Sequence, residues 1–392
     1  MDLSEEAHVA LHPHCMMGES WLDGSNDQSA PNVNANSIKI TDVTQDGDTL
    51  TFAITSQKLD SSKGICVFRT YEDFDWLQQS LFSQDDIAGL HGVIFPPLPA
   101  KPLPSSSYTQ AKALKQLGFL ALGDNWQLYC RALEFYLQQV AAHSILGKSK
   151  LLHSFLSSTE SAGKQRSKKG IFDRLSQAME EMRKEGHKDV DEFFHNERES
   201  NTHLTALFKS TTEKFLEVVL TKQRLALACG HFSTSLHLCV NQDNPSAVVF
   251  STICLKLSDI MDAVKRNLDK VSENDVRTLG LGLDLESRYQ EAKREMLFRR
   301  TSKLVELEII SKNAEKAKPN KKEIMDKVQK ITQKEFDLIS SVAKEEIDWY
   351  LKARVSVLRD FLIHWCEKQL DTARESAALF SQHLEAWKGF PV

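Results

Sequence analysis

Lysines concentrate in one short stretch towards the end of the chain. Residues 312 to 334 contain eight lysines and only three acidic residues, with Pro319 inside the stretch. Positive charge gathered at a turn attracts an anionic lipid surface without a shaped pocket, because each basic side chain near such a surface contributes about 1 kcal/mol. The predicted membrane contacts are the lysines nearest the proline: Lys316, Lys318, Lys321 and Lys322. The alternative interpretation is that these lysines are ordinary solvated flanks of helices.

A second basic segment precedes a series of apolar residues at helical spacing. Two lysines come just before the series, and its apolar members fall on one face of a helix with charges opposite. The residues concerned are Lys168, Lys169, Ile171, Phe172, Leu175 and Met179. An amphipathic helix with a basic start suits an anionic membrane surface. Packing of the same face against a neighbouring domain is the alternative.

Metal and disulfide chemistry are both disfavoured by the sequence. Three histidines and Cys15 lie close together near the N-terminus, but residues 1–35 are otherwise acidic and polar, with six acidic residues and no lysine or arginine. That composition is typical of a flexible leader, which offers no second shell of partners to orient metal ligands. The seven cysteines include no CxxC pair and indicate reduced thiols. We therefore expect no metal and no cofactor.

Catalytic motifs are missing from the sequence as well. It contains no nucleophile elbow, P-loop, paired metal motif or kinase signature, so we predict that the protein is not an enzyme. Apolar residues make up 41% of the chain and no uninterrupted apolar stretch reaches membrane-spanning length, which indicates a protein of the cytosol. Nucleic acid is not an expected partner, because no aromatic-lined basic groove accompanies the lysines.

The elements that position the lysines are long helices. Seven of the ten prolines come before residue 105, and the rest of the chain is rich in helix-forming residues. We predict three helices, over 190–242, 246–315 and 321–387, with a bend in the second at Gly280 or Gly282. Apolar residues in the third helix recur at steps of four and three, as in a coiled-coil seam. These are Leu351, Val355, Leu358, Leu362 and Trp365.

Helices of this length imply a partner. A helix of 50 to 70 residues is about 75 to 105 Å long, so apolar faces along it stay uncovered in a monomer. Dimerisation would cover them. A generic three-helix coiled coil is the alternative, and periodicity alone does not separate the two.

The first half of the chain predicts a different fold. Three β-rich runs at 37–40, 50–54 and 65–68 are separated by turn residues, and a helix follows from Tyr71. The segment 95–102, Phe-Pro-Pro-Leu-Pro-Ala-Lys-Pro, can form neither helix nor central strand and is predicted to be an extended loop. Helices at 126–140 and 151–156 complete an α+β domain.

This order of elements resembles the PX domain. The resemblance is carried by Arg-x-Tyr-x-Asp-Phe at 69–74 and by the proline loop with its lysine. A PX domain followed by long helices is similar to the PX-BAR sorting nexins, and Phe193-Phe194 with Leu-Phe-Arg-Arg-Thr at 297–301 resembles the branch of sorting nexins five and six. We divide the chain into an acidic leader (1–35), a PX domain (36–158), a basic linker with an amphipathic helix (159–185) and a BAR domain of three long helices (186–390).

The resemblance implies a phosphoinositide site with cations for the phosphates and a tyrosine against the sugar. The matching or displaced residues are Arg69, Tyr71, Lys101 and Arg131. Two of them depart from the family pattern. Thr70 stands where the family has the arginine that holds the 3-phosphate, and Arg69 is one position early, which on a strand is the opposite face. Tyr129 stands in the slot of the last arginine, close to Arg131.

The resemblance also implies a role. A PX-BAR sorting nexin is a peripheral protein of early endosome membranes that dimerises with itself or with another BAR-type sorting nexin, senses or induces membrane curvature, and contacts cargo receptor tails or retromer-type coat components. In the five-and-six branch the PX domain takes cargo peptides beside an insertion that follows the proline loop; here the corresponding segment, 105–127, is short. The rival hypothesis is a coiled-coil scaffold for proteins alone, whose PX fold no longer binds lipid.

Overall fold

The computed structural model of the 392-residue chain describes residues 33–57, 64–84, 87–102, 109–122, 126–158, 189–240 and 248–390. The chain divides into two compact units. Of the described residues, those within 208–284 and 356–390 form unit 1, and those within 33–207 and 285–355 form unit 2. Unit 2 therefore contains the described sheet together with the middle portion of the helical region.

The sheet has three antiparallel strands in the order β1, β2, β3. They span β1 (Lys39–Asp46), β2 (Thr49–Gln57) and β3 (Gly64–Thr70). Asp46 pairs with Thr49, so Gly47 and Asp48 form a two-residue turn. Gly47 has a φ of +56°, which a residue without a Cβ adopts at no steric cost in such a hairpin turn. Three strands are confirmed: β2 and β3 contain their predicted runs, whereas β1 shares only residues 39 and 40 with the predicted run 37–40 and continues to Asp46.

Helix α1 (Tyr71–Phe82) starts directly where β3 ends. Asp73, in its first turn, accepts hydrogen bonds from the backbone N–H of Thr70 at 2.8 Å and from the Thr70 hydroxyl at 3.0 Å. This carboxylate satisfies a donor that a helix start leaves unpaired. Phe74 and Leu77 are fully buried, so the helix packs its apolar face into the domain as predicted.

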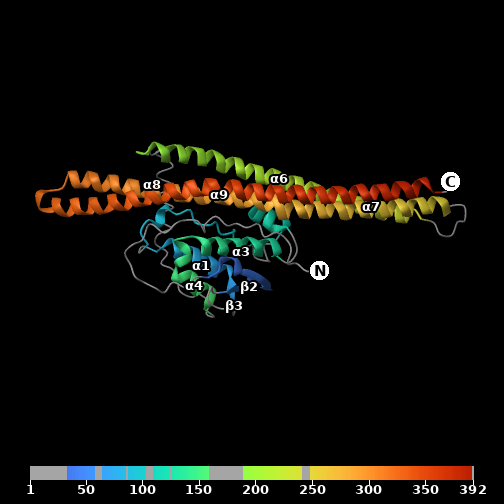
Figure 1. The fold of residues 1–392 in the computed structure, drawn as a ribbon, viewed down its shortest axis with the longest axis horizontal. Helices are drawn as coiled ribbons and strands as arrows, with labels where there is room; N and C mark the ends of the chain where they lie inside the picture. The colour runs from blue at the N-terminus through green and yellow to red at the C-terminus, as the bar shows by residue number, and fades with distance from the viewer. Residues whose placement is uncertain are drawn as a thin grey trace. The chain divides into compact units, whose positions relative to one another are not determined.

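Aromatic rings form the centre of the sheet domain. The Phe74 ring lies 6.0 Å from Phe52 on β2 and 5.2 Å from Phe155 on α4 (Lys150–Ser157). Tyr129, on α3 (Gln127–Ala142), lies 5.9 Å from Phe52. Such pairs contribute about 0.5–1.5 kcal/mol each beyond the area they bury. Figure 1 shows α1, α3 and α4 gathered beside the strands.

Short elements connect these parts. Helix α2 (Gln110–Leu117) follows the proline loop, within the short segment 105–127. Its N-cap is Thr109, whose hydroxyl accepts from the N–H of Lys112 at 3.3 Å. The single-turn 3₁₀ helices are η3 (Ala35–Ser37), η4 (Leu90–Gly92), η6 (Gly118–Ala121) and η8 (Leu146–Lys148).

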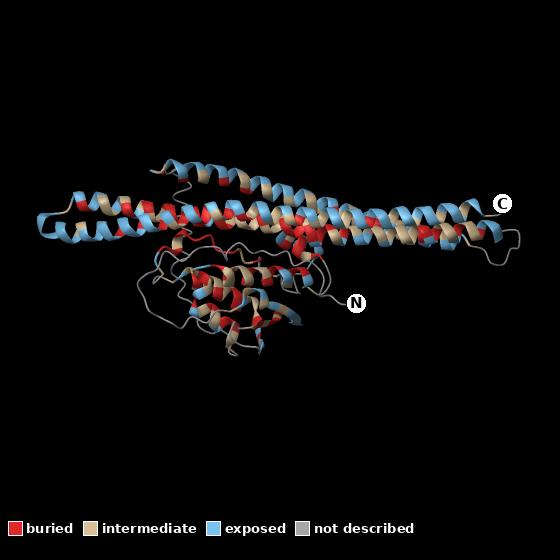
Figure 2. Cartoon of the chain, in the orientation of Figure 1, coloured by how far each residue is buried: buried red, intermediate tan, exposed pale blue. Residues whose placement is uncertain are grey.

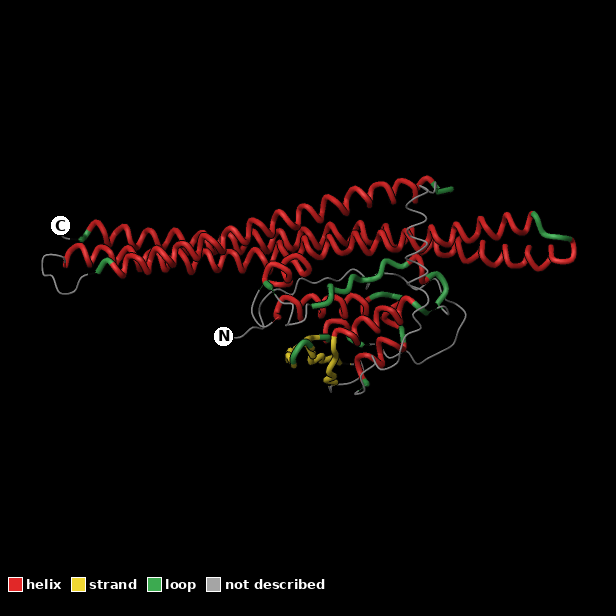
Figure 3. The backbone as a smooth tube through the Cα atoms, turned by 180° about the vertical axis from the view of Figure 1, so that it is seen from behind, coloured by secondary structure: helices red, strands yellow, loops and turns green. Residues whose placement is uncertain are grey.

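Long helices make up the rest of the described chain (Figure 3). They are α6 (Glu192–Leu238), α7 (Val248–Asp275), α8 (Leu281–Glu315) and α9 (Pro319–Lys388). A π-helical turn, η11 (Val276–Gly280), joins α7 to α8 without a break, so together they are the second predicted helix. This π turn ends at Gly280, one of the two positions at which the sequence predicts a bend. At 70 residues, α9 is about 105 Å long.

Buried residues recur among exposed ones along the long helices (Figure 2). In unit 2 a core cluster joins Phe194 of α6, Met296 of α8 and Ile347 of α9, all almost fully buried. In unit 1 the carboxylate of Asp275 is completely buried and accepts hydrogen bonds from Lys222 and from Trp365. The predicted fold class, a small α+β domain followed by long helices, is confirmed.

Candidate functional site

Two tyrosines hold the proline loop that carries Lys101. The Tyr71 hydroxyl donates to the carbonyl oxygen of Pro99 at 3.0 Å, and the Tyr129 hydroxyl donates to that of Ala100 at 2.9 Å. Burial raises the pKa of Tyr71 to about 12, with Asp75 and Glu72 adding to the shift, so its hydroxyl keeps the proton that it donates. The loop is thus fixed immediately before the predicted phosphate ligand.

Lys101 lies at the surface beside the start of α1. Its ammonium is 2.7 Å from the Glu72 carboxylate, and both side chains are more than half exposed. Partial burial acts to raise the pKa of Glu72, but the hydrogen bond and charge of Lys101 lower it overall. The structure therefore brings Tyr71 and Lys101 together, with an acidic neighbour that a phosphate would have to displace.

Arg69 has a different position. Its side chain is buried, with 1% exposed, and its guanidinium donates to the carbonyl oxygens of Phe155 at 2.7 and 2.9 Å and of Ser158 at 2.5 Å. The neighbouring Phe68 is 63% exposed, which shows the alternation of faces along β3. Arg69 thus ties β3 to the end of α4, and its position gives no support to a role as a lipid ligand.

Arg131 does not join Tyr71 and Lys101 either. It projects from α3, where its guanidinium lies 5.0 Å above the ring centre of Phe135 and 3.6 Å from the Glu134 carboxylate. Of the four predicted phosphoinositide residues, the structure gathers two, Tyr71 and Lys101, at one place.

The proline loop is fixed on its other side by long-range contacts within unit 2. Arg299 of α8 donates to the carbonyl oxygen of Val93 at 2.7 Å, and its guanidinium lies about 5 Å from the ring centres of Phe82 and Phe95. Burial lowers the pKa of Arg299 to about 10, which still leaves it charged at neutral pH. The segment before the loop is therefore held by a buried cation.

Glu346 of α9 completes this attachment. Its carboxylate accepts a hydrogen bond from the N–H of Ile94 at 3.1 Å and lies 3.2 Å from Nε2 of the buried His143. Nδ1 of His143 accepts from the N–H groups of Ile145 and Leu146, so Nε2 carries the proton donated to Glu346. Sequence reasoning missed both Glu346 and the role of Arg299; the one signal was the motif at 297–301.

The basic turn lies between α8 and α9. Every lysine from Lys312 to Lys334 is exposed. Within this group the structure records one ion pair, between Lys327 and Glu323 at 2.7 Å, and both of those side chains are largely exposed. The predicted contacts Lys316, Lys318, Lys321 and Lys322 thus lie together at one turn, open to solvent.

Other predicted residues lie elsewhere. The amphipathic segment with Lys168, Lys169, Ile171, Phe172, Leu175 and Met179, and the N-terminal histidines, fall outside the described residues. On α9, Leu351, Val355 and Leu362 are exposed, and Leu358 is partly exposed. Trp365 instead donates from its indole nitrogen to Asp275 at 2.8 Å, within the chain.

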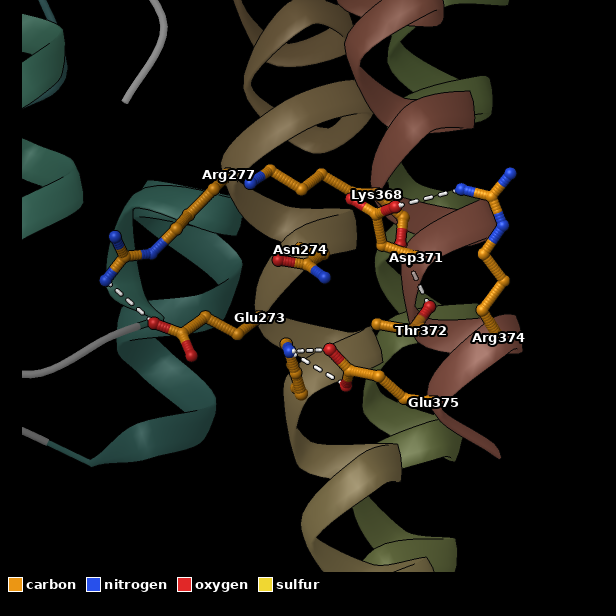
Figure 4. A pocket seen from close by; sticks show the side chains of 9 residues that line it. Glu273, Asn274, Arg277, Lys368, Asp371, Thr372, Arg374 and Glu375 are labelled. Atoms are coloured by element: carbon orange, nitrogen blue, oxygen red, sulfur yellow. Dashed lines mark hydrogen bonds and ion pairs between the residues drawn. The ribbon is translucent and has the colours of Figure 1, made fainter. Parts of the chain in front are cut away.

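A charged cleft of about 460 Å³ lies in unit 1, between the end of α7 with η11 and α9. Figure 4 shows ion pairs among its lining side chains, between Arg277 and Glu273 and between Arg374 and Asp371. Lys270 forms a further ion pair with Glu375 at 2.6 Å. Three of the four cations that line the cleft are thus paired with its three carboxylates, so its charges are largely balanced and we assign no ligand to it.

Metal sites and membrane-spanning helices are both missing from the described part of the chain. No group of three or more histidine, cysteine, aspartate or glutamate side chains there has the arrangement of a metal site. Among these residues, no helix has both the length and the apolar character needed to cross a bilayer.

Comparison with known proteins identifies the class. The family model of the PX domain matches residues 57–159. The cryo-EM structure of the SNX-BAR Mvp1 tetramer superposes with a TM-score of 0.52 at 16% sequence identity, over 88% of this chain and 99% of that one, and this likeness shows the fold. A PX sheet followed by long helices is the architecture of the PX-BAR sorting nexins, so the resemblance to that family is confirmed.

Curated relatives point to one branch of this family. Human (Homo sapiens) sorting nexin-6 is 25% identical over 380 residues, covering 90% of this chain and 91% of that protein. Mouse (Mus musculus) sorting nexin-32 is 24% identical over 386 residues, covering 90% and 93%. The chain is thus a relative of these sorting nexins along almost its whole length, similar to the five-and-six branch.

Proposed function

We propose that this protein is a non-enzymatic peripheral membrane protein of endosomal sorting, whose basic turn contacts anionic lipids. The observation that carries the proposal is the exposed lysine group between α8 and α9, with eight lysines from 312 to 334 and one recorded ion pair among them. Its relatives are sorting nexins, which supports a role in membrane-associated trafficking.

Charge explains how the turn would bind. Exposed lysines are attracted to an anionic surface over about a Debye length, roughly 8 Å at physiological salt. Four lysines contribute about 4 kcal/mol in total, or about a thousandfold in affinity. Because exposed charges are screened, binding should weaken steeply as salt rises.

The PX region would add a weaker contact. Tyr71 and Lys101 lie together at the proline loop, and a phosphoinositide phosphate would compete with Glu72 for the ammonium of Lys101. Arg69 is left out of this proposal because its guanidinium is committed to main-chain carbonyl oxygens. Cargo receptor tails are a further proposed partner of the sheet domain, and retromer-type coat components are a proposed partner of the protein.

We infer dimerisation through the helical region. Large apolar side chains remain exposed along α6 and α9, among them Leu225, Phe232, Val355 and Leu370. Uncovered apolar residues of this kind are typical of a surface that another chain covers. The partner is a second copy or another BAR-type sorting nexin, and the mass of the purified chain, alone and mixed with such a protein, separates the two.

Vesicle sedimentation tests the lipid proposal. The charge-reversed variant K316E/K318E/K321E/K322E should lose binding to phosphatidylserine vesicles that wild type binds. The matched control K209E/K214E/K352E/K388E changes four other exposed lysines and the net charge by the same amount. It should bind as wild type does.

Two outcomes reject parts of the proposal. Failure of the wild-type protein to sediment with anionic vesicles would favour the rival function, a coiled-coil scaffold for proteins alone. Equal binding by wild type and the charge-reversed variant would show that the basic turn does not contact the membrane. Other segments of the chain could then still bind it.

A further inference from the structure

The first turns of α9 carry an exposed apolar stripe beside the basic turn. Ile324, Val328 and Ile331 are 64%, 39% and 59% exposed. Steps of four and three residues place them on one face of the helix. Three β-branched apolar side chains in a row on a solvent-exposed face are costly to leave in water. We therefore expect another molecule to cover these three side chains.

The stripe adjoins the face that packs in the core. On the same stretch of α9, Thr332, Phe336 and Ile339 are buried, and Phe336 forms a cluster with Leu304 and Leu307 of α8. At 100° per residue, Phe336 lies about 140° around the helix from Ile331, whereas Ile339 lies only about 20° from Val328. The apolar surface of this stretch is therefore wider than the part that α8 covers, and its outer edge stays exposed.

Lysines border the stripe on both sides. Lys321 is three residues before Ile324 and Lys327 three after it, so helix geometry places them on opposite sides of Ile324. Lys334 stands in the same relation to Ile331 as Lys327 does to Ile324. Apolar residues edged by long cationic side chains match the interface of an anionic bilayer, where lysine stems lie along apolar surface and their ammonium groups reach the phosphates.

Farther along α9, Leu338 and Val342 continue the line of the stripe and are partly covered. An added Cβ at Gly89 would lie 2.9 Å from Val342 and 3.4 Å from Leu338, so the backbone of the sheet domain lies against them, although Leu338 remains 41% exposed. Ile324, Val328 and Ile331 lie nearer the basic turn and keep the exposures given above. A second copy meeting these three residues face to face would bring two sets of lysines together, which like-charge repulsion opposes.

We propose that Ile324, Val328 and Ile331 insert into an anionic membrane surface, beneath the headgroups that the flanking lysines contact. The inference rests on the proposed lipid function of the basic turn and deepens it, because it adds apolar insertion to charge attraction. Insertion places apolar volume in one leaflet, which favours a curved surface.

The test compares a triple variant with a double control on vesicles of phosphatidylcholine with phosphatidylserine. I324Q/V328Q/I331Q keeps every lysine and good helix propensity, and should bind about tenfold more weakly than wild type, the loss expected from about 1.4 kcal/mol of apolar burial. The control V249Q/L255Q changes two exposed apolar residues of α7, a helix that is not part of the proposed dimer surface, and should bind as wild type does. Solution mass checks that each variant keeps its oligomeric state.

A second measurement reports depth. In the variant I331W, the added indole should shift its emission to the blue on vesicles and be quenched by brominated lipid, after subtraction of the wild-type signal. Suppose that wild type binds vesicles, that the glutamine variant binds equally well, and that the added indole is not quenched. These results together would refute the insertion of the three side chains but would leave the proposed charge attraction standing. Loss of dimer mass in the glutamine variant would overturn insertion in favour of a second copy on the stripe. A wild-type chain that binds no vesicles at all would refute the proposed function itself.

Discussion

Arg300 and the lysines of the basic turn carry the same charge in opposite settings. Arg300 is 1% exposed, donates to the carboxylate of Asp189 at 2.6 Å and to the Ser340 hydroxyl at 3.0 Å, and lies over the ring of Phe194. Burial lowers the pKa of Arg300, and the charge of Asp189 opposes that shift. The lysines from 312 to 334 are exposed and almost free of ion pairs among the described residues.

The contrast teaches where to look for binding in this chain. A buried guanidinium has a planar set of donors that carbonyl and carboxylate oxygens fill completely, and it then fixes the fold. An exposed ammonium is a mobile point charge that remains available to an outside surface. The sequence around Arg69 predicts a lipid-binding side chain, but Arg69 is buried, as Arg300 is, and like Arg300 it stabilises the fold.

The largest expected effect is on the buried side of this comparison. Arg300→Ala leaves the Asp189 carboxylate buried without its partner, so the free energy of unfolding should fall by about 3–5 kcal/mol. Urea unfolding measures the loss. The double variant D189N/R300M, which removes both charges, should recover part of the stability. If its loss in the free energy of unfolding equals the sum of the losses in the two single variants, Asp189 and Arg300 are not directly coupled.

Arg69→Ala should have the next largest effect. It leaves the carbonyl oxygens of Phe155 and Ser158 without their donor, which costs about 2–3 kcal/mol of stability. Thermal unfolding measures it. Binding of the folded variant to phosphoinositide vesicles should match that of wild type, and a selective loss of lipid binding at unchanged stability would return Arg69 to the lipid site.

Glu346→Gln tests the attachment of the proline loop to α9. One oxygen that now accepts from Ile94 or His143 becomes an amide NH₂ that faces a donor, so we expect a loss of about 1–2 kcal/mol. Hydrogen exchange at the Ile94 amide should also accelerate. Glu345→Gln, at the exposed neighbouring position, is the control and should change neither quantity.

The smallest expected effect on stability is at Lys101. Its ion pair with Glu72 is largely exposed, so Lys101→Ala should change the free energy of unfolding by less than about 0.5 kcal/mol. Affinity for phosphoinositide vesicles should still fall if Tyr71 and Lys101 form the proposed pocket. Unchanged affinity would confine lipid binding to other parts of the chain.

Local sequence signals are enough for the elements of the fold. Alternating apolar residues and turn residues locate the three strands, and the scarcity of prolines after residue 105 locates the long helices. Helix ends differ by a few residues, because α9 continues at both ends beyond its predicted range. Exposure of the basic turn also follows from its sequence, since a proline between lysines has to lie at a surface.

Long-range partners are beyond the reach of sequence reasoning. Glu346 and Ile94 are separated by 252 residues, and Arg299 and Val93 by 206, so no local pattern reports their contact. Trp365 shows the same limit: its spacing fits an apolar seam, but its indole N–H is used by Asp275, on another helix. Spacing reveals which face a residue occupies and not which atoms it meets there.

Gly92 sets a condition on every related chain that keeps this architecture. A Cβ at this position would lie 2.4 Å from the carbonyl oxygen of Ile339 and 3.0 Å from the nitrogen of Ala343, both main-chain atoms that a rotamer change cannot move. Hydrogen is therefore the largest substituent this contact tolerates. A relative with alanine or a bulkier residue at the corresponding place must carry its proline loop at a different distance from the helix, which makes this one position a readable marker of how such chains are assembled.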